Sequence, residues 1–304
     1  MTSKSPIFIG GAGRAGTRLL RSIIGKIPTV FEIPRETYFF VSKSKSSLRV
    51  KKEIDSISDK KEKQKAYLLF TLLSIFYKQE IALKKFLVLK NNFSKIQATW
   101  VKHLIDSRSD QDSKIISMFQ KIQPHVNSID RFEIFDFVID CLCEEHNCER
   151  WVEKTPANIF NTKKILELYP SAKIIAITRN PLAVYASWKK KDKNKNIFLV
   201  IKNWINIHNS LQALKNSDFL YLIKYENLIN NPLVTIQSIC DFIEEPFAND
   251  LLDVEVLNTH TETRGQKGFN QDSLDNWKKE LYFLEKLIIK IFTGKLAREF
   301  GYLL

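Results

Sequence analysis

The start of the chain carries the pattern that most restricts its fold. Pro6–Gly10 is a short apolar run, Gly10–Gly16 is rich in glycine, and Thr17 to about Lys26 repeats its apolar residues with helical spacing. A strand, a tight turn and a helix in this order open α/β folds that bind nucleotides. We therefore predict an α/β fold with a ligand site at this first strand–helix junction.

Three later apolar runs predict further strands, and helical patterns separate them. The runs are Arg150–Val152, Lys173–Thr178 and Asp218–Lys224, and the helical patterns cover Pro156–Leu168, Pro181–Lys190 and about Ile197–Leu214. This alternation favours a P-loop-like parallel sheet with helices on both faces. Because ligands bind such sheets at the carboxyl ends of the strands, chemistry is expected at the strand–helix junctions.

Residues from about 42 to 147 have a different character. They are rich in lysine, contain no glycine and show helical periodicity, as in Leu68–Phe76 and Phe132–Leu142. No Gly/Ser-rich or Pro-rich linker marks a boundary. We predict one domain over residues 1–304 that carries this stretch as a helical insertion.

The chain is basic, with a formal net charge of +13. That charge favours an anionic partner such as a nucleotide, an acidic substrate, nucleic acid or a membrane, whereas a lysine-rich surface without such a partner is the alternative. The longest uncharged apolar run, Ala66–Tyr77, is shorter than a bilayer span, and Ile7–Ile9 is too short for a signal-peptide core. We expect a cytoplasmic protein without a transmembrane anchor.

The first junction predicts a phosphate cradle that differs from a kinase loop. Glycines let backbone N–H groups close around an anion, and the following helix adds its dipole. A kinase loop needs lysine and then Ser/Thr after its last glycine, whereas Thr17 and Arg18 follow Gly16 here and Arg14 is the basic residue inside the loop. A dinucleotide fingerprint also fits the glycine spacing, and a turn without a ligand is the third reading.

The second junction pairs an arginine with a serine. Arg179 follows the strand Lys173–Thr178, Asn180 and Pro181 suit the first positions of a helix, and Ser187 lies about two turns farther on. An arginine and a hydroxyl group placed in this way can hold one phosphate. The alternative is a surface arginine and a serine on a helix face, without a ligand.

Together the two junctions resemble the family of sulfotransferases that use 3′-phosphoadenosine 5′-phosphosulfate (PAPS), in motif style closest to its tyrosylprotein and carbohydrate branches. Pro6–Thr17 looks like the family's 5′-phosphosulfate loop, and Arg179 with Ser187 looks like its 3′-phosphate clamp. The resemblance covers about residues 6–36 and 150–280. It implies transfer of a sulfuryl group from PAPS to a hydroxyl acceptor, with an amine as the less favoured acceptor and no required metal.

The resemblance also implies which residues bind the donor. Tyr225, in Tyr225–Leu228, is similar to a family segment near the adenine or the 3′-phosphate, and Arg264–Gly268 looks like a basic loop that closes over the phosphates. The implied donor-binding residues are Arg14, Ala15, Gly16, Thr17, Arg18, Arg179, Ser187, Tyr225, Lys267 and Gly268.

Two catalytic roles follow from the same resemblance. Lys154, in Glu153-Lys154-Thr155-Pro156, would offset the charge that builds on the bridging oxygen as the bond to sulfur breaks, and Thr155 is expected to cap the next helix. Glu36, in the pair Glu36-Thr37, would take the acceptor proton, with Glu32 as its competitor. None of the five histidines matches the base of the small-molecule branch, and His103 is the one to test first.

Other functions fit parts of the sequence. A kinase-like P-loop enzyme would share the glycine turn, although the lysine that it needs after Gly16 is absent. A nucleic-acid-binding protein would account for the charge and would bind with a steep salt dependence, but it leaves the basic residues at the junctions unexplained, so we expect no specific nucleic acid.

The cysteines do not predict a metal site. Cys141, Cys143 and Cys148 surround His146 without the spacing of a common zinc site, so reduced thiols and no metal are expected.

The sequence does not identify the acceptor. Carbohydrate, peptide tyrosine, lipid and small alcohol all stay open as acceptors, and the insertion at about 42–147 is expected to shape their site.

Overall fold

The computed structural model describes residues 5–41, 45–90, 110–254 and 269–304. The chain divides into two compact units. We call residues 29–153 the helical unit, and residues 5–28 together with 154–304 the strand unit.

The strand unit is built on three parallel strands in the order β1-β4-β5. They are β1 (Ile7–Gly11), β4 (Lys173–Thr178) and β5 (Leu220–Lys224). Ile7 lies opposite Lys173, and Ile174 lies opposite Leu220. Every residue of β1 is buried, as expected for a parallel sheet that is covered on both faces.

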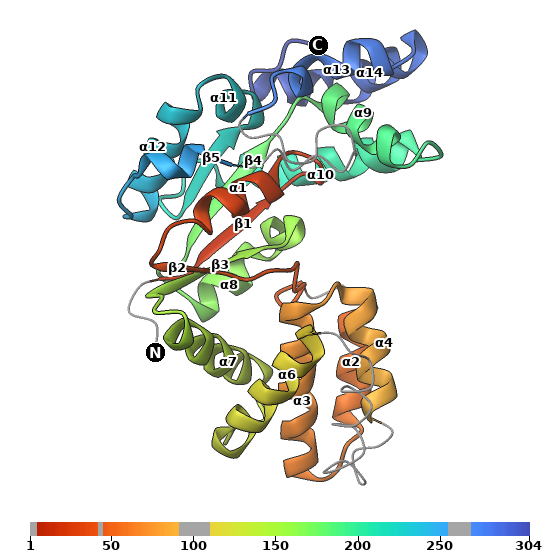
Figure 1. The fold of residues 1–304 in the computed structure, drawn as a ribbon. Coiled ribbons are helices and arrows are strands. Elements are labelled where there is room, and N and C mark those ends of the chain that lie inside the picture. The colour runs from red at the N-terminus through yellow and green to blue at the C-terminus, as the bar shows by residue number, and fades with distance from the viewer. Residues whose placement is uncertain (1–4, 42–44, 91–109, 255–268) are drawn as a thin grey trace. The chain divides into compact units, whose positions relative to one another are not determined.

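Helices cover both faces of these strands (Figure 1). A Cβ atom on Gly10 would meet Ile159 of η3 (Pro156–Asn161) on one face. On the other face the ring of Tyr221 stacks on Phe242 of α12 (Pro232–Ile243), with centroids 5.2 Å apart. The alternation of side chains along each strand separates the two layers.

The remaining helices of the strand unit follow the chain order. They are α1 (Thr17–Ile24), α8 (Thr162–Leu168), α9 (Pro181–Lys191), α10 (Ile197–Leu214), α11 (Tyr225–Asn230), α12 (Pro232–Ile243), η4 (Asn249–Leu252), α13 (Asp272–Glu280) and α14 (Phe283–Glu299).

The helical unit holds a pair of parallel strands, β2 (Val30–Glu32) and β3, which runs through Arg150–Lys154. Its helices are α2 (Lys45–Asp55), α3 (Lys60–Phe76), α4 (Gln79–Lys90), α6 (Asp110–Ile122), η2 (Gln123–His125) and α7 (Arg131–Glu145). The central helix α3 contacts α4, α6 and α7. Its apolar residues are therefore buried on several sides of the helix, not on one stripe.

An aromatic cluster joins the start of the helical unit to α7. Phe39 stacks on Phe135 with centroids 4.5 Å apart, and Phe40 meets the edge of the same ring at 5.4 Å. Phe135 also meets Trp151 of β3 at 5.6 Å. Offset and edge-on contacts of this kind add to the free energy gained by burying the rings.

Most predicted elements of the strand unit are confirmed. The α/β class and the parallel pairing are correct, and β4 and α10 have the predicted bounds. The predicted helix Pro156–Leu168 is in fact η3 followed by α8, because Asn161 leaves helical dihedral angles, with φ −122° and ψ 16°. The described parts of 42–147 are helical, and the assignment of 1–304 to one domain stays a prediction. In the described ranges, no helix is long and apolar enough to cross a bilayer.

His208 is a fully buried titratable group on α10. Its ring stacks on Trp204 with centroids 3.5 Å apart, and Phe300 meets it edge-on at 4.7 Å. Nδ1 lies 2.7 Å from the carbonyl oxygen of Trp204, and Nε2 has no hydrogen-bond partner. Because burial disfavours the charged ring, the pKa of His208 falls from 6.5 to about 4.

Acid should therefore destabilise the strand unit through His208. Between pH 6.5 and about pH 4 the unfolded chain binds a proton that the folded chain does not, so the free energy of unfolding falls by up to roughly 3 kcal/mol as the pH drops. We expect His208→Phe to flatten this part of the pH profile in urea unfolding. His125→Phe, at an exposed position, is the control, and equal slopes for both variants would contradict the assignment.

Candidate active site

The turn between β1 and α1 lies at the carboxyl end of β1. Its backbone is left-handed at Arg14 and Gly16, with φ of 72° and 100°. Gly16 is the N-cap of α1 and offers no side-chain oxygen to the first helical N–H groups. The first N–H groups of α1 therefore have no capping side chain, as at helix starts that can bind anions, and the phosphate cradle stays a prediction.

The loop packs tightly against two aromatic rings. A Cβ atom on Gly16 would lie 2.5 Å from Cδ2 of Tyr225, and one on Gly13 would lie 3.2 Å from Cζ2 of Trp188. At Gly16 the positive φ adds a second reason for glycine. Trp188 was not singled out from the sequence, where its place directly after Ser187 was the available signal.

Arg179 ties the end of β4 to this loop. The residue is 7% exposed, and Nη1 donates a hydrogen bond to the Arg14 carbonyl at 3.0 Å, while Nη2 donates to the Ser273 carbonyl at 2.5 Å. The guanidinium carbon lies 4.2 Å from the centroid of the Tyr225 ring. Nε is buried and has no hydrogen-bond partner. Burial lowers the pKa of Arg179, but an arginine remains charged.

The structure brings together one residue from each of the two predicted phosphate-binding groups, Arg14 and Ser187. Arg14 of the loop donates a hydrogen bond from Nε to Oγ of Ser187 on α9, at 3.0 Å. Burial lowers the pKa of Arg14, and the charges of Arg18 and Arg179 lower it further. No acidic side chain of the described ranges forms an ion pair with Arg14. The cluster therefore concentrates positive charge, which an anion would neutralise.

A second set of contacts holds Arg179 in place. The Asn180 side chain accepts a hydrogen bond from Leu182 N–H at 2.9 Å, so the predicted N-cap is confirmed. The Asn180 N–H donates to Glu226 at 2.9 Å, and Trp204 Nε1 donates to the Arg179 carbonyl at 3.0 Å. These bonds fix the backbone on both sides of the arginine.

Ser273 in the first turn of α13 completes the surroundings of the arginine. Its hydroxyl lies 2.8 Å from the hydroxyl of Tyr225, and its carbonyl accepts the bond from Arg179. Sequence reasoning missed Ser273. A serine at this position indicates where a helix begins, but it does not indicate contact with a residue 94 positions away in the chain.

Lys154 is the last residue of β3 and is 2% exposed. Only Thr155 separates it from η3, so its predicted place at a strand–helix junction is correct. The prediction that Thr155 caps the next helix is correct for its position but wrong for its side chain. Thr155 occupies the N-cap position of η3, but its side chain makes no capping hydrogen bond, and its carbonyl accepts from Asn158 N–H at 2.9 Å instead.

The pair Glu36-Thr37 follows β2 in the helical unit. Oε2 of Glu36 accepts a hydrogen bond from the Tyr38 hydroxyl at 2.9 Å. Thr37 donates from its N–H and its hydroxyl to Oε1 of the buried Glu153, at 3.1 and 3.0 Å. Burial and the nearby Glu36 raise the pKa of Tyr38, so its hydroxyl remains a donor at neutral pH.

Some of the other predicted residues are described by the structure, and some are not. Ala15 and Thr17 are buried in the loop and the first turn of α1, and Arg18 is exposed. Glu32, the competing base, ends β2. Lys267, Gly268 and His103 lie outside the described residues.

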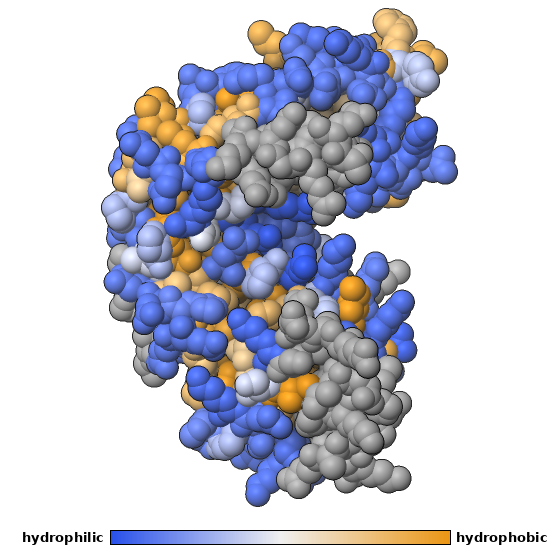
Figure 2. Space-filling view, in the orientation of Figure 1, coloured by the Kyte–Doolittle hydropathy of each residue, from blue (hydrophilic) through white to orange (hydrophobic). Residues whose placement is uncertain are grey.

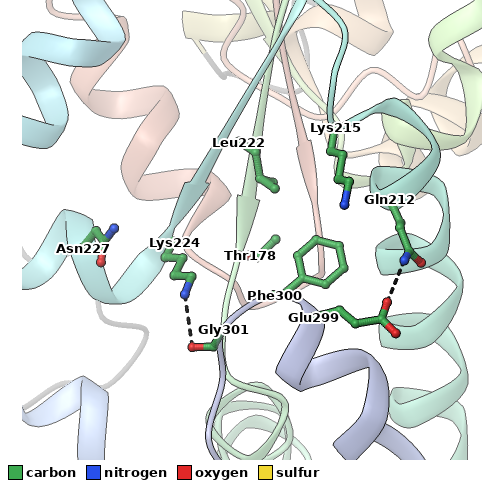
Figure 3. A pocket seen from close by; sticks show the side chains of 9 residues that line it. All are labelled: Thr178, Gln212, Lys215, Leu222, Lys224, Asn227, Glu299, Phe300 and Gly301. Atoms are coloured by element: carbon green, nitrogen blue, oxygen red, sulfur yellow. Dashed lines mark hydrogen bonds between the residues drawn. The ribbon is translucent and has the colours of Figure 1, made fainter.

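A pocket of about 430 Å³ opens beside the carboxyl ends of β4 and β5 (Figure 3). It is lined by Thr178, Gln212, Lys215, Leu222, Lys224, Asn227, Glu299, Phe300 and Gly301. Lys224 donates to the Gly301 carbonyl at 3.1 Å, and Gln212 donates to Glu299 at 2.6 Å. None of the predicted donor-binding residues lines this pocket, although Thr178 and Lys224 directly precede Arg179 and Tyr225 in the chain.

The cysteine cluster at the end of α7 forms separate contacts. The Cys143 thiol lies 3.8 Å from the Arg150 carbonyl, and the Cys148 thiol lies 3.5 Å from the His146 carbonyl. Burial raises the pKa of Cys143 to about 12, so its thiol stays protonated at neutral pH. Among the described residues, no three His, Cys, Asp or Glu side chains gather as a metal site would require.

A sequence profile of the sulfotransferase family matches residues 6–249, most of the chain. The chain belongs to the sulfotransferase family. The match includes both junctions, around Arg14 and Arg179, so the family predicted from these motifs is confirmed.

Solved structures agree with this sulfotransferase assignment at the level of the fold. The sulfotransferase domain from the curacin biosynthetic pathway has a TM-score of 0.58 and 18% identity, with 100% of both chains covered. The sulfotransferase domain of the olefin synthase from Synechococcus PCC 7002 has a TM-score of 0.56 and 19% identity, covering 99% of this chain and 97% of that domain. A search of curated proteins finds no match.

The contact between the loop of this sulfotransferase and Tyr225 can be tested with one methyl group. Gly16→Ala places Cβ against the Tyr225 ring at a positive φ, and we expect it to lower the free energy of unfolding by about 1–3 kcal/mol. Gly294→Ala is the matched control, because nothing lies within 4 Å of the added Cβ on α14. Urea unfolding measures both. Equal stability of Gly16→Ala and the wild type would contradict the described packing.

Proposed function

We propose that this chain transfers a sulfuryl group from PAPS to a hydroxyl acceptor. The observation that carries the proposal is the buried guanidinium of Arg179, which lies over Tyr225, is hydrogen-bonded to the phosphate loop and has an unpartnered Nε. A buried cation with a free donor, next to a second arginine without a carboxylate partner, suits a multiply charged anion.

PAPS fits this arrangement better than ATP does. The loop N–H groups with Arg14, Ala15, Gly16, Thr17 and Arg18 are proposed to hold the 5′-phosphosulfate. Arg179, Ser187, Lys267 and Gly268 are proposed to hold the 3′-phosphate, with Tyr225 beside them. ATP lacks a 3′-phosphate and would leave the second group without a partner. The hydrogen bond from Arg14 to Ser187 supports the proposal, because it joins residues of the two groups.

The reaction is proposed to be a direct in-line transfer. The acceptor oxygen forms a bond to sulfur while the bond from sulfur to the bridging phosphate oxygen breaks, and 3′-phosphoadenosine 5′-phosphate leaves. Lys154 would offset the negative charge that develops on that oxygen, and Glu36 would take the proton of the acceptor hydroxyl. Positioning and charge stabilisation would supply most of the rate, without a metal or a covalent enzyme intermediate.

The helical insertion at about 42–147 is proposed to select the acceptor. The candidate classes are carbohydrate, peptide tyrosine, lipid and small alcohol. A transfer screen with radiolabelled PAPS across these classes would identify the acceptor, and Arg179→Ala would show whether the label depends on this site.

Binding of the bisphosphate product tests the donor site directly. It should raise the melting temperature of the wild type, and Arg179→Ala should weaken the binding about 10- to 100-fold in calorimetry, because a hydrogen bond to a charged group is lost. Arg298→Ala, at an exposed position of α14, is the matched control. A wild type that ATP with magnesium stabilises more than the bisphosphate does would overturn the proposal.

The base is tested once the acceptor screen gives a substrate. Glu36→Gln should lower kcat by about 100- to 10,000-fold, since the acceptor proton loses its base, while the affinity for the bisphosphate stays unchanged. Glu32→Gln is the isosteric comparison at the end of β2. If Glu32→Gln loses more activity than Glu36→Gln, Glu32 and not Glu36 takes the proton.

A further inference from the structure

The outer side of α14 carries large apolar side chains. Leu284, Leu287 and Ile291 are spaced by three and four residues and form one stripe along the helix. Phe283 and Phe292 flank this stripe, and all five residues are between 41% and 76% exposed. Single exposed leucines need no explanation, but a continuous stripe of them does.

The apolar surface continues onto α10. The ring of Phe198, which is 54% exposed, meets Phe292 edge-on with centroids 5.9 Å apart. Figure 2 shows apolar side chains at the top right, where Figure 1 places α14. We call this surface the α14 face; its members are Phe198, Phe283, Leu284, Leu287, Ile291 and Phe292.

The α14 face is large for a surface in water. If each of its six residues has on the order of 200 Å² of surface when fully free, the exposed fractions leave roughly 700 Å² in contact with water. That area exceeds the largest apolar patch of most monomers, about 300–600 Å². A partner that covers it is therefore expected.

Exposed cations border the α14 face. Lys290 lies beside Ile291 on α14, Lys202 lies one helical turn after Phe198 on α10, and Lys193 lies in the loop before Phe198. In the described part of the chain, none of these three lysines has an ion-pair partner. Glu285 at the start of α14 is paired with Lys189, at 2.8 Å. Asp192, beside Lys193, is an exposed carboxylate of the same loop, and the three lysines still leave the border with a net positive charge.

We propose that the α14 face binds the surface of an anionic lipid bilayer. Apolar and aromatic side chains enter the boundary between headgroups and acyl chains, while lysines at the border meet the lipid phosphates. A second copy of the chain fits less well, since it would bring two positively charged borders to the same interface. No residue of the α14 face belongs to the cluster around Arg179, so this proposal is independent of the donor site.

Vesicle binding tests the proposal. The wild type should co-sediment with vesicles of phosphatidylcholine and phosphatidylglycerol, and much less with phosphatidylcholine alone. Leu284→Ser/Ile291→Ser should lose at least ten-fold in affinity. Lys202→Gln/Lys290→Gln should lose about five-fold per lysine on the anionic vesicles only. Leu233→Ser/Val234→Ser, which changes two exposed apolar residues on α12, is the matched control and should bind as the wild type does.

Three outcomes would overturn the proposal. They are a wild type that does not co-sediment with anionic vesicles, equal binding by the α14 and α12 variants, and a wild-type dimer in light scattering that Leu284→Ser/Ile291→Ser converts to a monomer. The last result would assign the face to a second copy. Unchanged melting temperature and unchanged bisphosphate binding of each variant show that the fold and the donor site are intact.

Discussion

The burial of one guanidinium group organises the strand unit around its junctions. Arg179 gives up water on nearly all sides, and such a cation is stable only where protein oxygens replace that water. Two of its donors reach carbonyls from separate segments, the loop after β1 and the first turn of α13. The third donor, Nε, has no partner. The arginine thus joins three parts of the chain, and one of its donors is not used by the protein.

The shape of the loop follows from the same packing. Tyr225 lies under the guanidinium and also against Gly16, so a larger residue in the loop would push the ring away from the arginine. Arg14 extends the arrangement from the loop to Ser187 on α9. Positive charge is thereby concentrated by backbone geometry and ring packing. The glycines, the tyrosine and the arginines of these motifs therefore form one cluster, although Arg14 and Tyr225 are 211 positions apart in the chain.

The two functions proposed for the molecule occupy different elements. The proposed donor site uses the carboxyl ends of β1 and β4, where parallel strands and helix starts converge. The α14 face uses helices of the strand unit that lie after these strands in the chain, with apolar residues on one side of α14 and buried ones such as Ile289 and Thr293 on the other. A sulfotransferase that binds a lipid surface would meet acceptors held at that surface at a raised local concentration.

The local elements and the order of the motifs could be predicted from the amino-acid sequence. The apolar run before Gly10 and the strand Lys173–Thr178 are visible because strands buried on both faces are apolar at nearly every position. The helix Ile197–Leu214 is visible because burial of one side imposes a helical period on its apolar residues. Three other features could not be predicted in this way: Arg14 reaches Ser187, Ser273 lies beside Arg179, and α14 keeps its apolar stripe exposed. These are contacts, or missing contacts, between residues far apart in the chain. The spacing of neighbouring residues does not predict such contacts, because they depend on how separate helices and strands pack against one another.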